Sequence, residues 1–63
     1  MKIIKLKGVE SGEAIYINIE QIIFFGGNDK KDMSYIQLVD NCRLYVTETP
    51  KQIVDLIRKA ENR

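Results

Sequence analysis

The sequence predicts an α+β domain that is mainly β: a small antiparallel sheet or partial barrel of about five strands, with one C-terminal amphipathic helix. Short segments of alternating apolar and polar residues, separated by turn-forming residues, predict the strands. A capping box followed by an apolar stripe of helical spacing predicts the helix. The 63 residues leave room for a single small domain, residues 1–63, and no second one.

The expected strands span residues 2–7, 14–19, 22–26, 33–39 and 42–47. In the second strand Ile15, Ile17 and Ile19 share one face, an alternation typical of a half-buried strand. Residues 22–25 are apolar without interruption, so both faces of the third strand carry apolar side chains. The segments 8–13 and 26–32 are rich in glycine and polar residues and are predicted loops.

The last two strands form a predicted hairpin around Asp40 and Asn41, which both tolerate the left-handed backbone of a two-residue type I′ turn. We therefore favour the register in which Tyr35 faces Val46. A loop one residue longer is the alternative, and it reverses one strand relative to the other. It would place four apolar side chains on one face: Ile36, Leu38, Leu44 and Val46.

The helix is expected over residues 50–61. Thr49 is a good N-cap, Pro50 fits the first helical position, and Gln52 completes a capping box. Four apolar residues then follow at i, i+3, i+4 and i+7: Ile53, Leu56, Ile57 and Ala60.

One helix of this length covers one face of a small sheet, yet the strands carry apolar residues on both faces. Exposing the second face to water is unfavourable, and monomers rarely expose large contiguous apolar patches. Either the sheet curls and buries its inner face in itself, or a second copy or another protein covers the surplus. A chain of 63 residues is also expected to be thinly stable without such a supplement.

The inventory for catalysis is poor. The chain has no histidine and a single cysteine, Cys42, which excludes an internal disulfide and the usual zinc sites. We therefore expect no enzymatic activity, no metal and no cofactor. The 10 basic and 9 acidic residues give a net charge of +1 and no general basic field. No membrane span or signal peptide is recognisable, so we expect a cytoplasmic protein without membrane insertion.

On these grounds we expect a non-enzymatic protein-interaction or accessory module. We expect it to self-associate, as a homodimer or larger assembly, through an apolar sheet face or a strand edge. The candidate interaction residues are Tyr16, Phe24, Phe25, Tyr35, Arg43 and Tyr45.

The alternative is a nucleic-acid-binding regulator or accessory domain, in which the tyrosines stack on bases. Four basic residues could form a stripe beside the tyrosines: Lys2, Lys5, Lys7 and Arg43. The near-neutral net charge does not favour this alternative.

Two families share parts of this pattern. The segment Tyr16-Ile17-Asn18, the later hairpin and the terminal helix resemble the small flagellar FlbD/SwrD family over about residues 14–58. That resemblance implies an interaction role in flagellar accessory proteins, without catalysis. The strand order from residue 22 to residue 49 is also similar to part of the LytTR DNA-binding domain, which would imply a truncated DNA-binding relative.

Overall fold

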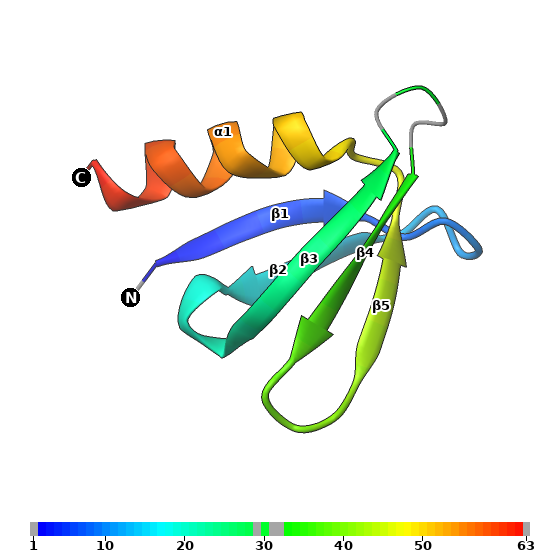
Figure 1. Cartoon of the computed structure of the whole chain (residues 1–63), viewed down its shortest axis with the longest axis horizontal. Helices are drawn as coiled ribbons and strands as arrows, with labels where there is room; N and C mark the ends of the chain where they lie inside the picture. Colours follow the sequence, from blue (N-terminus) through cyan, green and yellow to red (C-terminus); the bar gives the residue numbers. More distant parts are fainter. Residues whose placement is uncertain (1, 29, 31–32, 63) are drawn as a thin grey trace.

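The computed structural model describes residues 2–28, 30 and 33–62, and Figure 1 shows their arrangement. The elements follow in the order β1 (Ile3–Lys7), β2 (Ala14–Asn18), a 3₁₀ turn (Ile19–Gln21), β3 (Ile22–Asn28), β4 (Met33–Leu38), β5 (Arg43–Val46) and α1 (Pro50–Glu61). The predicted fold class is confirmed: the chain is mainly antiparallel β with one C-terminal helix.

The strands form two sheets, β1–β2 and β3–β4–β5, and both are antiparallel throughout. They meet at one corner, where Gly8 bridges to Val46. At the same corner the Thr47 N–H donates to the Lys7 carbonyl at 2.9 Å, and the Val9 N–H donates to the Tyr45 carbonyl at 3.1 Å. The two sheets therefore curl around a common interior, in the spatial order β2–β1–β5–β4–β3.

That interior holds the core. Six apolar side chains from both sheets and the helix are buried together: Ile4, Leu6, Ile17, Ile36, Val46 and Ile53. Helix α1 lies along β1 and against β3 (Figure 1). Its stripe closes the interior, since Leu56, Ile57 and Ala60 pack against the buried cluster. Curling, the first of the two expected solutions, thus accounts for the inner faces.

The helix begins as the sequence predicts. The Thr49 side chain accepts the Gln52 N–H at 3.2 Å, and the Gln52 side chain accepts the Thr49 N–H at 2.9 Å. Pro50 occupies the first turn, where its missing N–H leaves no bond unmade.

The favoured hairpin register is wrong, and the alternative with a longer loop is correct. Ile36 faces Leu44 and Ser34 faces Val46 across β4 and β5. The loop has three residues, because the Leu38 N–H donates to the Cys42 carbonyl at 2.8 Å and the Asn41 N–H donates to the Leu38 carbonyl at 3.2 Å. A type I′ turn needs positive φ at both central residues, whereas here Asn41 alone of the pair has one, at 70°.

Strand β3 differs most from expectation. It continues to Asn28 rather than ending at residue 26, so Gly26 and Gly27 belong to the sheet and pair with β4. The rest of the predicted 26–32 loop includes residues 29, 31 and 32, which lie outside the described residues. Two smaller differences remain. Residue 19 begins the 3₁₀ turn rather than ending β2, and strands β1, β4 and β5 are each one or two residues shorter than expected.

A β-bulge between Ile22 and Phe24 decides how the apolar run in β3 divides. Ile22 and Phe25 turn inward and pack against the core. Ile23 and Phe24 both remain outside, because the extra residue breaks the alternation of the strand at this point. The surplus of apolar residues predicted for the sheet is therefore real, and part of it lies on the outer face.

Candidate interaction surface

The convex side of the β3–β4–β5 sheet carries a group of aromatic side chains. The strand register places Tyr35 between Gly26 and Tyr45, and it places Gln37 between Phe24 and Arg43. Same-face neighbours on adjacent strands lie close enough for their side chains to touch. We call this surface the outer aromatic face and define it by six residues: Phe24, Met33, Tyr35, Gln37, Arg43 and Tyr45.

Tyr35 is the centre of this face and is held from two sides. Its ring makes a T-shaped contact with the Phe24 ring, with a centroid distance of 6.3 Å and an interplanar angle of 80°. The guanidinium carbon of Arg43 lies 5.0 Å from the Tyr35 centroid, a cation–π contact. Arg43 is itself fixed, since its Nε donates to Oε1 of Gln37 at 3.2 Å. These contacts hold the side chains of this face in a fixed arrangement.

Gly26 makes this arrangement possible. A Cβ atom at residue 26 would lie 2.9 Å from the Tyr35 hydroxyl oxygen and 3.2 Å from the ring carbon that bears it. Tyr35 therefore lies across β3 at Gly26, where no side chain of β3 stands in its way. Sequence reasoning missed Gly26, because a glycine pair beside polar residues has the composition of a loop. Its spacing from Phe24 was the available signal, as residues i and i+2 of a strand share a face.

The face is open to solvent. The exposed fraction is 47% for Phe24, 53% for Tyr45 and 43% for Met33. Ile23, which the bulge turns outward beside Phe24, is 58% exposed. Exposed apolar side chains that adjoin one another in this way are typical of interaction sites, whereas single ones are ordinary.

Four of the six predicted interaction residues thus come together: Phe24, Tyr35, Arg43 and Tyr45. Phe25 does not join them, because it faces Ile36 on the inner side of the sheet and packs against the core. Tyr16 is 66% exposed but lies on β2, opposite Lys5 in the other sheet. The two lie apart from the outer aromatic face.

The predicted basic stripe is divided in the same way. Lys5 and Lys7 lie on β1, and Lys2 directly precedes that strand. Arg43 begins β5, whereas β1 reaches β5 only at the opposite end, through Gly8 and Val46. Val46 lies three positions after Arg43, a distance of about 10 Å at the usual rise per residue. Arg43 therefore lies apart from the three lysines, whereas Tyr45, whose carbonyl accepts the Val9 N–H at 3.1 Å, lies next to the corner where β1 ends.

Cys42 lies exposed beside the hairpin loop. The pKa of its thiol is raised, first by a hydrogen bond with the Asp40 side chain and then by the negative charge of that carboxylate. A raised pKa lowers the thiolate fraction and so the nucleophilicity at neutral pH. Among residues 2–28, 30 and 33–62, no three histidine, cysteine, aspartate or glutamate side chains gather to hold a metal ion.

Compared with protein-family models, with curated proteins and with solved structures, the chain gives no match. Within the part of the chain that the structure describes, no helix is long and apolar enough to cross a membrane.

Proposed function

We propose that this protein is a non-enzymatic interaction module that self-associates through the outer aromatic face. The observation that carries the proposal is the ordered cluster around Tyr35, solvent-exposed at Phe24, Met33 and Tyr45. Tyrosine, phenylalanine, methionine and arginine are the residues enriched at protein interfaces. A pre-ordered aromatic cluster also loses little conformational freedom on binding.

A second copy of the chain is the partner that this face suits best. In a two-fold dimer the same patch meets itself, so a patch with many like charges would repel its copy. Arg43 is the one charged side chain among the described residues of β3, β4 and β5, and Tyr35 and Gln37 already engage it. A small domain also gains proportionally more stability from extra buried surface than a large one does.

Light scattering coupled to size exclusion tests this proposal, in reducing buffer so that Cys42 cannot link two copies. We expect a dimer or larger assembly at micromolar concentration for the native chain. Tyr45→Asp and Phe24→Asp should shift it to monomer, because each places an unpaired carboxylate in the interface. A native chain that stays monomeric throughout the micromolar range would end the proposal.

Tyr16→Asp is the matched control. It introduces the same charge at another exposed aromatic residue, but in the other sheet. It should leave the assembly unchanged, and circular dichroism should show that all three variants keep the fold. Phe25→Asp, which the sequence alone would suggest as a test, is unsuitable because Phe25 packs against the core.

Nucleic-acid binding is the second candidate, favoured by exposed aromatic side chains on a sheet beside Arg43. Fluorescence anisotropy with single-stranded and duplex oligonucleotides, at low and moderate salt, tests it. Salt-sensitive micromolar binding that Tyr45→Asp abolishes would support it over self-association. The resemblance to the FlbD/SwrD family accords with the first candidate, and the resemblance to LytTR domains accords with the second.

A further inference from the structure

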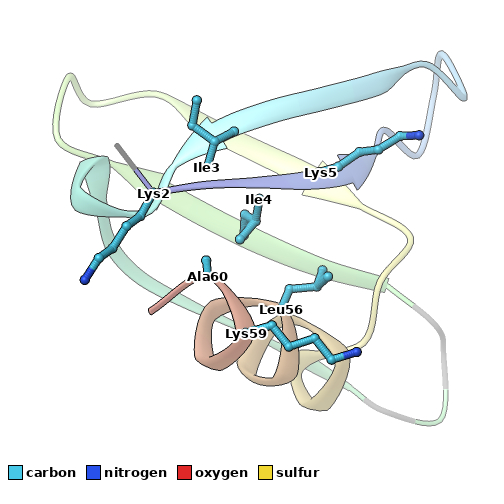
Figure 2. Close-up of a pocket in the computed structure, with 7 residues that line it drawn as sticks. All are labelled: Lys2, Ile3, Ile4, Lys5, Leu56, Lys59 and Ala60. Carbon is cyan, nitrogen blue, oxygen red and sulfur yellow. The ribbon is translucent and has the colours of Figure 1, made fainter. Parts of the chain in front are cut away.

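A second surface, remote from the outer aromatic face, lies between β1 and α1 (Figure 2). It is an open groove of about 360 Å³, within the size range of ordinary ligand sites. Ile4, Leu56 and Ala60 point toward one another across its floor (Figure 2). Its other lining residues are Lys2, Ile3, Lys5 and Lys59.

The groove follows a free strand edge. The Gly8 N–H donates to Glu13 at 3.0 Å and the Ile19 N–H donates to Lys2 at 3.0 Å, so the even-numbered residues of β1 face β2. In an antiparallel strand successive residues direct their N–H and C=O groups to opposite edges. The backbone groups of Ile3 and Lys5 therefore point away from β2, toward the side on which α1 lies.

Lys7 shows what this edge binds. It belongs to the same odd-numbered set, and its carbonyl accepts the Thr47 N–H at 2.9 Å. Its N–H donates to the Glu48 carboxylate at 3.0 Å. Beyond this point β5 has diverged, and in the described part of the chain no turn, loop or side-chain hydrogen bond reaches Ile3 or Lys5 at the edge.

The charge of the groove has one sign. Three of its lining residues are lysines, Lys2, Lys5 and Lys59, and none of its described lining residues is acidic. Acidic side chains line the neighbouring surfaces instead: Glu48 and Asp55 share one with Lys59, and Glu20 and Glu61 share another with Lys2. A cationic rim over an apolar floor attracts a partner that carries both carboxylates and apolar side chains.

We propose that this groove binds a short, extended, acidic peptide segment, which adds as a strand to the edge of β1 at Ile3 and Lys5. Strand addition satisfies the free backbone groups, and alternate side chains of an added strand face opposite ways. Carboxylates on one set of alternate residues meet the lysines, while apolar residues of the other set contact Ile4, Leu56 and Ala60. The site is separate from the proposed self-association surface, so either can fail alone.

Fluorescence anisotropy with a labelled peptide of alternating glutamate and valine tests the charge requirement. We expect micromolar binding that weakens as salt rises, and no binding of the same peptide with lysine in place of glutamate. Lys59→Glu should weaken binding by about fivefold to tenfold. Arg58→Glu is the matched control, because Arg58 directly precedes Lys59 in the helix, is also exposed, undergoes the same change of charge and does not line the groove.

Peptide variants test strand addition separately from charge. Two versions are N-methylated on complementary sets of alternate residues, which blocks one or the other hydrogen-bonding edge. Strand addition requires that one version binds and the other does not. Equal binding of both versions, or a loss with Arg58→Glu that matches the loss with Lys59→Glu, would overturn the proposal. Tyr45→Asp should bind the peptide as the native chain does, which distinguishes this site from the outer aromatic face.

Discussion

Phe24 and Phe25 are neighbours in β3 with opposite surroundings. Phe25 faces Ile36 and packs against the core, whereas Phe24 makes a T-shaped ring contact with Tyr35 on the outer side and is 47% exposed. The inner face is closed by the second sheet and by α1, while the outer face is ordered only by contacts among its own side chains. Two residues of equal hydrophobicity thus differ in environment: Phe25 stabilises the core on one side of the sheet, and Phe24 remains exposed on the other.

Truncating one side chain on each face tests this difference most strongly, because the two truncations should differ in their cost to stability. Ile36 is fully buried, so Ile36→Ala should cost about 3 kcal/mol of unfolding free energy through lost burial and a cavity. Tyr35→Ala removes one edge contact and one cation–π contact at the surface and should cost about 1 kcal/mol.

Urea denaturation followed by far-UV circular dichroism measures both costs. If Ile36→Ala leaves too little folded protein, Ile36→Val provides the smaller step, about 1 kcal/mol. Similar costs for Ile36→Ala and Tyr35→Ala would mean that the two faces do not differ in the way described.

The two glycines of β3 allow the same difference to be tested by adding a single Cβ atom on either face. A Cβ at Gly27 would lie 2.5 Å from the Met33 carbonyl oxygen and 2.9 Å from the Ser34 Cα, which are backbone atoms of the paired strand. Gly27→Ala should therefore cost about 2 kcal/mol, because β4 itself must shift. At Gly26 the new Cβ meets only the end of the Tyr35 side chain, which can rotate away.

Gly26→Ala should accordingly cost less than about 1 kcal/mol of stability. It should still weaken self-association, because the added Cβ displaces the Tyr35 ring from its place over residue 26. Urea denaturation and light scattering on both variants separate the two effects. A Gly26→Ala variant that assembles like the native chain would show that the position of Tyr35 does not matter for association.

The sequence predicts α1 in full because its signals are local. Thr49, Pro50 and Gln52 stand within four positions of one another, and the structure shows the two capping hydrogen bonds that they predict. The strands are also recognisable from alternation. The register of the hairpin cannot be predicted in the same way. It depends on whether Asp40 has a positive φ as Asn41 does, and a difference of one loop residue reverses the faces of a whole strand.

The site was predictable only in part for the same reason. Aromatic residues on the strands could be selected from composition, but their direction depends on pairing between distant segments. The bulge between Ile22 and Phe24 sends Phe24 outward and Phe25 inward, and no local pattern marks it. The groove beside β1 escaped sequence reasoning entirely, because Lys5 and Lys59 meet only through the packing of α1 on β1.

The smallest expected effect lies at the hairpin loop, which belongs to neither face. Hydrogen bonding with Asp40, and then its negative charge, raise the pKa of Cys42 above its ordinary value. At a fixed neutral pH the thiolate fraction is therefore low. Asp40→Asn removes the charge and should lower this pKa, so alkylation by iodoacetamide should become faster near neutrality. At a pH where both thiols are fully ionised, the two rates should converge.

Asparagine retains a side-chain oxygen that can accept the Cys42 N–H, which Oδ1 of Asp40 accepts at 3.2 Å. The melting temperature and the assembly state should therefore stay unchanged, as expected for a change away from both faces. Glu10→Gln, which removes one exposed carboxylate from a different turn, is the control for net charge and should leave the alkylation rate as it is. Equal acceleration by both variants would assign the effect to the overall field of the protein rather than to Asp40.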